Sequence, residues 1–283
     1  MICGPGKEKY MVKIAKRLRA GERKRLQKRM DEARVQGGLS ASLFLEWEMN
    51  ALTHADCFFF YGGRLCPKGV LSVFFPDEGH AELTVARFAE KTGILSELFF
   101  RALKECNRVG VSDIHTVVDP SLGFSLEEAE GITFSYERSE YMLRIALEEL
   151  VKKHTGLPED TVLTKEETED GDGTVRYGLV RDRKVITECL IYPMPGTNEA
   201  YLYGLKTETA FRRQGLATRL MGEIAGDLTG QGIHMMRLQV SSENREAETL
   251  YRKLGFETEE ERKYYRTKEQ PDGRTGKLPE RME

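Results

Sequence analysis

Two stretches decide the fold, Arg212-Arg213-Gln214-Gly215-Leu216-Ala217 and, about thirty residues later, Asn244-Arg245-Glu246-Ala247-Glu248-Thr249-Leu250-Tyr251-Arg252-Lys253-Leu254-Gly255-Phe256. The first lies between a predicted strand, residues 199–207, and a predicted helix, residues 213–229. Backbone N–H groups at a helix N-terminus carry partial positive charge and attract anions. Because Gly215 and Ala217 are small and Arg212 and Arg213 are cationic, the stretch predicts a pyrophosphate site. Close packing at the helix start is the alternative interpretation.

The second stretch predicts a helix with one polar group on its apolar face. Asn244 is a preferred N-cap residue. Ala247, Leu250, Tyr251 and Leu254 follow at a spacing of three or four, so they share one helical face. Tyr251 therefore points toward the core while its hydroxyl needs a partner. The sequence leaves two interpretations, a core tyrosine with a satisfied hydroxyl or a proton donor.

Found together in this order, the two stretches resemble the GNAT superfamily of acyl-CoA-dependent N-acyltransferases. The first matches the superfamily pattern Arg/Gln-x-x-Gly-x-Gly/Ala, and the second matches Asn-x-x-Ala-x-x-Leu-Tyr-x-x-x-Gly-Phe in full. The resemblance covers roughly residues 174–266. It implies a site for acetyl-CoA in which Asn244 binds the pantetheine arm or anchors the neighbouring loop. It also implies two further groups: pyrophosphate ligands Arg212, Arg213, Gln214, Gly215, Leu216 and Ala217, and pantetheine-binding backbone at Leu205, Lys206 and Thr207.

The resemblance further implies direct transfer of an acetyl group to a primary amine. Tyr251 would be the general acid that protonates the departing CoA thiolate, and a backbone N–H near residues 205–207 would polarise the thioester carbonyl. The amine must also lose a proton. Some superfamily members carry a glutamate in the third strand, where this chain has Tyr201. Glu199 is the favoured base here, with Glu188, Glu243 or ordered water as alternatives.

The same order of predicted elements occurs twice along the chain. A shift of 122 residues carries Gly93 onto Gly215, Gly110 onto Gly232 and Phe134 onto Phe256 without a gap. The pattern predicts an α/β fold (an α+β mixed sheet) that is antiparallel early and parallel near the middle, duplicated as two GNAT-like domains in tandem. Two unrelated halves are the alternative. The expected ranges are a degenerate domain at residues 1–146, a linker at 147–160, a catalytic domain at 161–268 and a polar tail at 269–283.

The first copy lacks the residues that carry the chemistry. At the same shift, Glu90 replaces Arg212, Leu95 replaces Ala217, Leu122 replaces Asn244 and Ala129 replaces Tyr251. An acidic residue repels pyrophosphate, and alanine has no proton to donate. We therefore expect that the first copy does not bind acyl-CoA productively. Its predicted helices, two short ones broken at Gly21 within residues 7–36 and one at 41–51, are expected to wall the acceptor site of the second copy.

The charge of the chain is unevenly distributed. The net charge is −3, but residues 7–36 hold twelve Lys/Arg against four Asp/Glu, which leaves −11 on the rest. The basic segment is either an arm for an acidic partner or membrane surface, or, as we favour, an amphipathic helix on the protein's own body. The overall charge argues against nucleic acid as the main partner. The acidic remainder suggests a cationic acceptor such as a polyamine, an aminoglycoside or a protein lysine.

The composition indicates where the protein is found and which cofactors it lacks. No apolar run approaches ~20 residues and the N-terminus has no apolar signal core, so we expect a cytoplasmic protein without a membrane partner. The five cysteines show no metal-binding spacing, so reduced thiols and no metal are expected. An oligomer and an acyl group longer than acetyl both stay open. The sequence thus predicts an N-acetyltransferase, and the alternative is a non-catalytic GNAT-fold module that binds CoA or serves as a scaffold.

Overall fold

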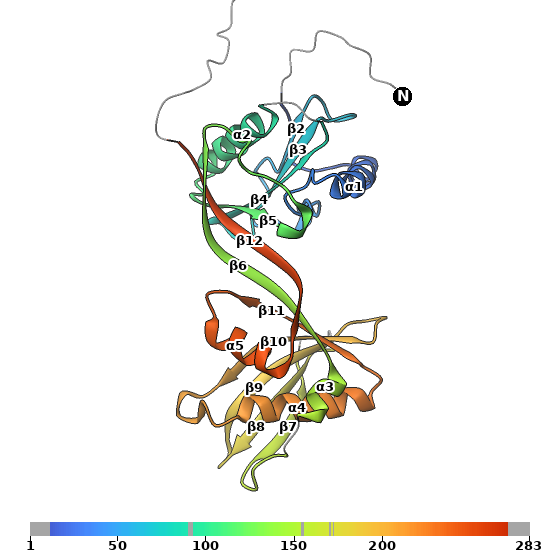
Figure 1. Ribbon diagram of the computed structural model, residues 1–283, viewed down its shortest axis with the longest axis vertical. Helices are drawn as coiled ribbons and strands as arrows, with labels where there is room; N and C mark the ends of the chain where they lie inside the picture. Colours follow the sequence, from blue (N-terminus) through green and yellow to red (C-terminus); the bar gives the residue numbers. More distant parts are fainter. Residues whose placement is uncertain (1–11, 90–92, 154–155, 170, 172, 271–283) are drawn as a thin grey trace, which may run out of the picture. The chain divides into compact units, whose positions relative to one another are not determined.

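The computed structural model describes residues 12–89, 93–153, 156–169, 171 and 173–270 (Figure 1). It divides into two compact units. Unit 1 comprises Met1–Arg138 together with Arg262–Glu283, and unit 2 comprises Ser139–Glu261. Among the described helices, none combines the length and the apolar character that crossing a bilayer requires.

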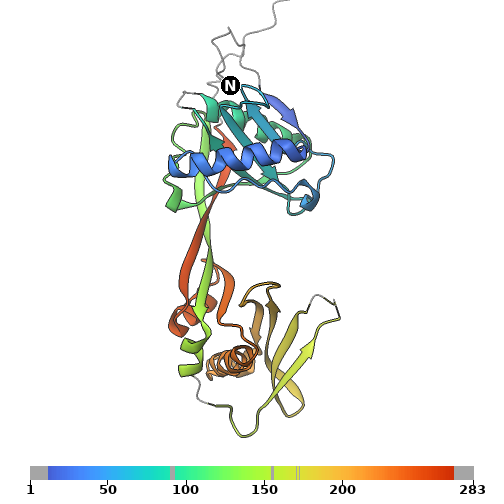
Figure 2. The ribbon, with the colours of Figure 1, turned by 90° about the vertical axis from the view of Figure 1, so that its right-hand side faces the viewer.

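Unit 1 is a sheet packed on a phenylalanine-rich core. Phe58, Phe59 and Phe60 are buried in that core with Leu98 and Phe99. Figure 2 shows α1 lying across the strands of this unit. Its elements in chain order are β1 (Lys13–Ala15), α1 (Ala20–Val35), the 3-10 turn η1 (Trp47–Met49), β2 (Phe58–Tyr61), β3 (Gly69–Phe74), β4 (His80–Arg87), α2 (Ile94–Arg108), β5 (Asp113–Val118) and η2 (Pro120–Leu122).

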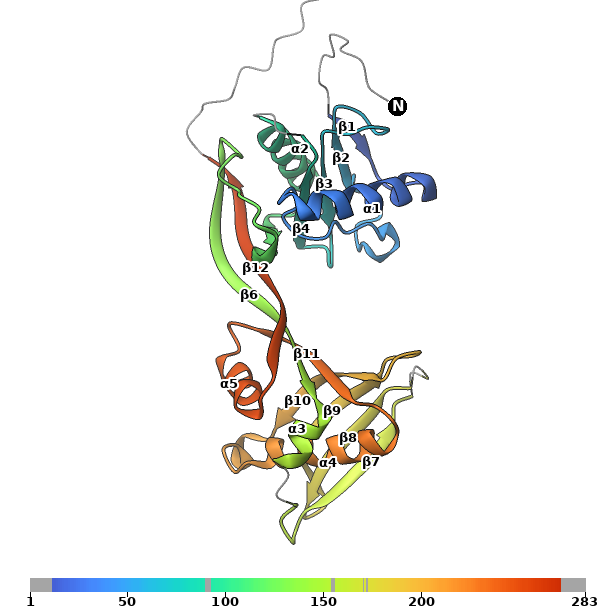
Figure 3. The same ribbon diagram turned by 45° about the vertical axis from the view of Figure 1, so that its right-hand side comes forward.

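Unit 2 repeats this arrangement around a second core. The buried faces of α4 and α5 contribute Leu220, Ile224, Tyr251 and Leu254 to that core. Figure 3 shows α3 beside α4. Its elements are α3 (Leu147–Lys152), β7 (Val162–Glu167), β8 (Val175–Arg181), β9 (Lys184–Pro193), β10 (Glu199–Thr207), η3 (Thr209–Phe211), α4 (Leu216–Gly230), β11 (Met235–Ser241) and α5 (Arg245–Leu254).

The predicted duplication and the predicted mixed sheet are confirmed. Helices α2 and α4 begin and end 122 residues apart, and each follows a left-handed glycine, Gly93 at φ +81° and Gly215 at φ +75°. Each copy begins with antiparallel neighbours and has one parallel pair near the middle of the sheet, β4 with β5 and β10 with β11. The two left-handed glycines before these helices are the pair that the 122-residue shift superimposes.

The last strand of each copy serves both units. β6 (Ile132–Ala146) and β12 (Glu257–Glu269) are unusually long. In unit 1 the order is β1-β2-β3-β4-β5-β12-β6, and in unit 2 it is β12-β6-β11-β10-β9-β8-β7. In unit 1, β12 of the second copy therefore lies between β5 and β6. In unit 2, β6 of the first copy lies between β11 and β12.

Because of this exchange, the compact units differ from the consecutive ranges expected from the sequence. Arg262 and the residues after it fall in unit 1, where Lys263–Arg266 pair antiparallel with His115–Val118. Residues 139–146 fall in unit 2, where they pair with β11. Local periodicity reports that a strand forms and gives no information on which sheet it joins. The helix expected in the linker is present as α3.

Several helix predictions for the first copy are wrong. Lys13–Ala15 form a strand on β2, and α1 is one helix through Gly21; residues 7–11 lie outside the described residues. Residues 41–51 contain only η1, because their backbone bonds to the sheet: the N–H of Phe44 donates to Ser72 Oγ at 3.2 Å and that of Ala51 to the carbonyl of Phe75 at 2.8 Å.

The basic helix α1 is held by its own unit. Leu26, Met30 and Ala33 are buried. Arg29 donates to the carbonyl of Pro67 at 2.7 Å, and Glu22 accepts two hydrogen bonds from Arg64 at 2.9 and 2.7 Å. The interpretation of this segment as a helix on the protein's own body is thus confirmed for the described residues.

We predict that Tyr264→Ala lowers the free energy of unfolding of unit 1 by about 3 kcal/mol, because it removes a large buried aromatic side chain. Tyr264 is 6% exposed, and the guanidinium of Arg138 lies 4.3 Å from its ring centroid. Amide hydrogen exchange of β5 is the measurement, since β5 pairs directly with this part of β12. Lys268→Ala, at an exposed position of the same strand, is the matched control. Unchanged β5 protection in Tyr264→Ala would contradict the role assigned to the exchanged strand.

Candidate active site

The two parallel strands of unit 2 separate halfway along their length. β10 pairs with β11 from Glu199–Met235 to Leu202–Leu238, and there the pairing ends, although both strands continue. The register of β10 on β9 shifts between Tyr203 and Lys206, and Gly204 has φ +66°. This bulge turns β10 away from β11. The backbone groups of β10 beyond Leu202 therefore face an open split.

The N-terminus of α4 follows the split strand. Gly215 is the N-cap in a left-handed conformation, and no side chain caps the helix. The first N–H groups of a helix have no intrahelical acceptor, so those at the start of α4 are free for an anion. A Cβ built on Gly215 would meet nothing within 4 Å, so the space before this backbone is open. These features fit a pyrophosphate.

The two arginines of the loop differ in their contacts: Arg212 is hydrogen-bonded to β10, whereas Arg213 is exposed. Arg212 Nε donates to the carbonyl of Thr207 at 3.1 Å and fixes the loop to the end of β10. Gln214 similarly donates to the carbonyl of Ala210 at 3.2 Å. Arg213 has φ +60° and a side chain 91% exposed, with only a 3.9 Å approach to Glu246. Arg213 is thus the cation most available to a phosphate.

Asn244 and Tyr251 sit on α5 as the pattern predicts. Asn244 Oδ1 accepts from the N–H of Ala247 at 3.2 Å, which makes Asn244 the helix cap. Tyr251 is 6% exposed, and its ring packs edge-to-face on Phe256 with the ring centroids 5.5 Å apart. Burial raises the pKa of Tyr251 to about 12, so the phenol is protonated at neutral pH. Its hydroxyl has no hydrogen-bond partner among the residues that the structure describes.

The expected base, Glu199, is engaged elsewhere. Its carboxylate lies 3.0 Å from the guanidinium of Arg237, which also contacts Glu259 at 2.9 Å. Glu199 is the first residue of β10, about 13 Å along the strand from Tyr203, where the split begins. Glu188 lies opposite Lys206 on β9, and Glu243 is exposed after β11.

Tyr201 lies at the split, although the sequence pattern assigned it no role. Burial raises the pKa of Tyr201, with an opposing contribution from a backbone hydrogen bond with Gln239. Gln239 is the first residue of β11 beyond the last pair with β10, so the phenol lies where the strands part. Its position in the third strand was the available signal. A neutral phenol there cannot act as a base at neutral pH.

In unit 1 the equivalent split is filled by the chain itself. β4 and β5 pair from His80–Asp113 to Leu83–Thr116 and then separate. Residues 38–40 lie along the free part of β4: the N–H of Ser40 donates to the carbonyl of Val85 at 2.9 Å, and that of Arg87 to the carbonyl of Gly38 at 2.6 Å. The N–H of Asp119 donates in turn to the carbonyl of Ser40 at 2.6 Å.

This filling segment satisfies the backbone groups that a pantetheine arm would otherwise bind. Ser40 is completely buried. Among the described residues of unit 2, no segment lies along β10 in the same way. Of the residues substituted in the first copy, Leu95, Leu122 and Ala129 are buried, while Glu90 lies outside the described residues. The structure thus adds a backbone reason to the side-chain reasons for expecting that the first copy does not bind acyl-CoA productively.

Comparison with known proteins places the fold. Residues 176–266 match the family model described as FR47-like protein. A tandem GNAT protein from the clavulanic acid biosynthesis pathway, solved without AcCoA, aligns with a TM-score of 0.63 at 14% identity, over 93% of this chain and all of that one. A GCN5-related N-acetyltransferase from Sphaerobacter thermophilus aligns with a TM-score of 0.55 at 12% identity, over 75% of this chain and 80% of that one. A GNAT-family acetyltransferase from Colwellia psychrerythraea aligns with a TM-score of 0.52 at 14% identity, over 90% of this chain and 99% of that one. No relative was found among proteins with curated descriptions.

The chain has the fold of these GNAT proteins. More particularly, it has the tandem GNAT arrangement, with the FR47-like sequence in its C-terminal copy.

We predict that acetyl-CoA binds once per chain and that Gly215→Ala weakens this binding about tenfold or more, because a Cβ would occupy the anion's approach to the backbone. Gly93→Ala is a matched control, since Gly93 has the same left-handed conformation and the same open surroundings in unit 1. Each substitution should cost about 1 kcal/mol of stability from backbone strain. Isothermal titration calorimetry measures both affinity and stoichiometry. Two sites per chain, or equal loss in both variants, would contradict the assignment.

Proposed function

We propose that unit 2 transfers an acetyl group from acetyl-CoA to a primary amine. The observation that carries this proposal is the unpaired edge of β10, followed after η3 and a short loop by the anion-attracting start of α4. The family match over residues 176–266 supports it, since that range spans both features. In unit 1 the corresponding edge is bonded to residues 38–40, so we assign the reaction to unit 2 alone.

The residues of unit 2 divide the work between binding and proton transfer. The start of α4 and Arg213 bind the pyrophosphate, and the free backbone of residues 203–207 binds the pantetheine arm. The neutral amine attacks the thioester carbon, a C–N bond forms and the C–S bond breaks. A backbone N–H of the split strand stabilises the oxyanion. The nitrogen loses one proton and the sulfur gains one, so the products are the N-acetyl amine and CoA.

Tyr251 supplies the proton to the sulfur. Its raised pKa, about 12, keeps the phenol protonated across the neutral range. The same value makes it a weak acid, so we assign proton transfer to the stage at which negative charge develops on the sulfur. The hydroxyl is then reprotonated from solvent after each turnover.

We predict that Tyr251→Phe lowers kcat about 100-fold and leaves the acetyl-CoA KM nearly unchanged, because only the donated proton is lost. Thiol release from acetyl-CoA over a panel of amines is the measurement, and Tyr136→Phe, at an exposed tyrosine of unit 1, is the control. Since the raised pKa keeps the phenol protonated below about pH 11, wild-type kcat should show no alkaline loss from this group up to pH 10. Full activity in Tyr251→Phe would exclude the acid role. Tight acetyl-CoA binding without turnover on any amine would favour the non-catalytic alternative.

Glu199 is tested separately as the base. Because its carboxylate is held by Arg237, we predict that Glu199→Gln changes kcat less than about fivefold and leaves the acidic limb of the pH–rate profile in place. Loss of that limb, with a large fall in kcat, would instead identify Glu199 as the base. Glu188→Gln, on the neighbouring strand, is the comparison variant. Where neither variant moves the limb, the amine loses its proton to water.

For the acceptor we propose a cationic amine. Tyr201 and Tyr203 lie on the same face of β10, with ring centroids 6.3 Å apart, and Tyr203 is 40% exposed. Aromatic faces attract ammonium groups, and the charge of −11 outside residues 7–36 adds a long-range attraction. Polyamines, aminoglycosides and lysine side chains share this chemistry, and the amine panel distinguishes them.

A further inference from the structure

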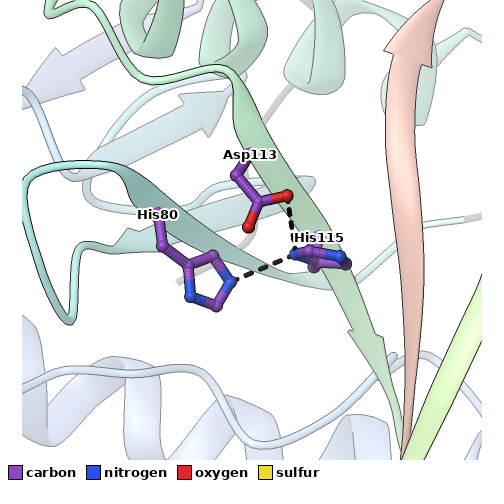
Figure 4. A group of neighbouring side chains, drawn as sticks. All are labelled: His80, Asp113 and His115. Atoms are coloured by element: carbon purple, nitrogen blue, oxygen red, sulfur yellow. Dashed lines mark hydrogen bonds and ion pairs between the residues drawn. The ribbon is translucent and has the colours of Figure 1, made fainter.

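Unit 1 gathers two histidines and an aspartate on neighbouring strands (Figure 4). His80 on β4 lies opposite Asp113 on β5 in the parallel register, and His115 follows Asp113 by two residues, so it shares the same face. One nitrogen of each ring and one carboxylate oxygen lie within 4.8 Å of one another. His80 Nε2 is 3.1 Å from His115 Nδ1, which is 3.9 Å from Asp113 Oδ1.

A second carboxylate fixes the orientation of His115. Glu137 on β6 accepts a hydrogen bond from His115 Nε2, and Arg266 holds Glu137 at 2.6 Å from the other side. His115 is 1% exposed, so its ring cannot turn freely. With the proton on Nε2, the lone pair of Nδ1 points toward His80 and Asp113. A carboxylate behind an imidazole in this way is the usual support of a metal-binding histidine.

The cluster has more acceptors than protons to satisfy them. Asp113 Oδ1 is buried, and the guanidinium of Arg266, 3.0 Å away, pairs with it from one side as an ion pair. The lone pair of His115 Nδ1 faces the same space. His80 can bring one proton from Nε2 and can satisfy only one of these two atoms. A cation between the three would satisfy all of them.

The donor set selects the type of cation. Two ligand atoms about 2.1 Å from a tetrahedral ion lie about 3.4 Å apart, close to the 3.1 Å between the ring nitrogens. Arg266 and Arg138 both contact Glu137, so the cluster offers little excess negative charge. Recognition must then depend on the nitrogen lone pairs, which favours Zn²⁺ over Mg²⁺ or Ca²⁺.

We propose that unit 1 binds one Zn²⁺ through His80 Nε2, His115 Nδ1 and Asp113 Oδ1. The side chain of Asp113 is 46% exposed, which leaves room for water as a further ligand. The ion joins β4 to β5 and, through Glu137 and Arg266, supports the neighbouring β6 and β12. The site is independent of the acetyl transfer proposed for unit 2.

The test measures Zn²⁺ binding by the full chain after treatment with a chelator. Zn²⁺ is titrated in competition with a chromophoric chelator, and Co²⁺ serves as a spectroscopic probe of the ligand geometry. Cys3 and Cys66 are replaced by serine in every sample, because thiols bind Zn²⁺ and Cys66 is exposed. His80→Ala and Asp113→Asn are the diagnostic variants, since both residues are partly exposed and tolerate change better than buried His115. His54→Ala, an exposed histidine of the same unit, is the matched control.

We expect one Zn²⁺ per chain in the parent protein and in His54→Ala, with affinity at least tenfold weaker in His80→Ala and Asp113→Asn. Zn²⁺ should also raise the thermal midpoint of unit 1 in the parent and not in these two variants. Circular dichroism and acetyl-CoA binding report whether each variant is folded. No Zn²⁺ binding at micromolar concentration, or equal affinity in all variants, would overturn the proposal and leave a direct hydrogen bond between His80 and His115.

Discussion

The site depends on one limit in backbone pairing, the end of the parallel ladder between β10 and β11 after Leu202 and Leu238. Parallel strands that continued in register would satisfy each other's N–H and C=O groups and leave nothing for a ligand. The bulge at Tyr203–Lys206, with Gly204 in a left-handed conformation, prevents this. The loop that follows is tied back to the end of β10 by Arg212, so the free strand edge and the helix start are held as one surface.

In the first copy, a segment of the chain itself occupies the equivalent split. Its parallel ladder ends at the equivalent place, and residues 38–40 then occupy the edge of β4 through backbone hydrogen bonds. The requirement to satisfy buried backbone groups is the same in both copies. In the first copy, residues 38–40 satisfy these backbone groups. In the second copy, we propose that a bound substrate satisfies them. A preserved fold therefore says little about a preserved activity, and the occupant of the split is the more informative feature.

Local patterns were sufficient for the elements that local interactions determine. The helix after β10, the cap at Asn244 and the inward direction of Tyr251 each depend on a few neighbouring residues, and each was predicted, although the helix begins at Leu216 and not at residue 213. The filling segment and the shared strands depend on pairing between residues far apart in sequence, and no periodicity reports them. Residues 41–51 misled for the same reason, since a helical spacing of apolar residues is also what a segment lying along a sheet can show. The spacing of the cysteines gives no signal for the histidine cluster, because Asp113 and His115 alternate on one strand and meet His80 only through parallel pairing.

The exchange of β6 and β12 has a consequence for how the protein is made. Unit 1 is encoded almost entirely by the first half of the chain, yet the strand between β5 and β6 comes from Arg262 onward. A ribosome releases the chain from the N-terminus, so unit 1 waits with an open sheet edge until nearly the whole protein has been synthesised. Unit 2 already has β6 available when its own strands emerge. Unit 1 is thus the last to be completed, and its exposed edge during synthesis is the point at which misassembly or a chaperone would act.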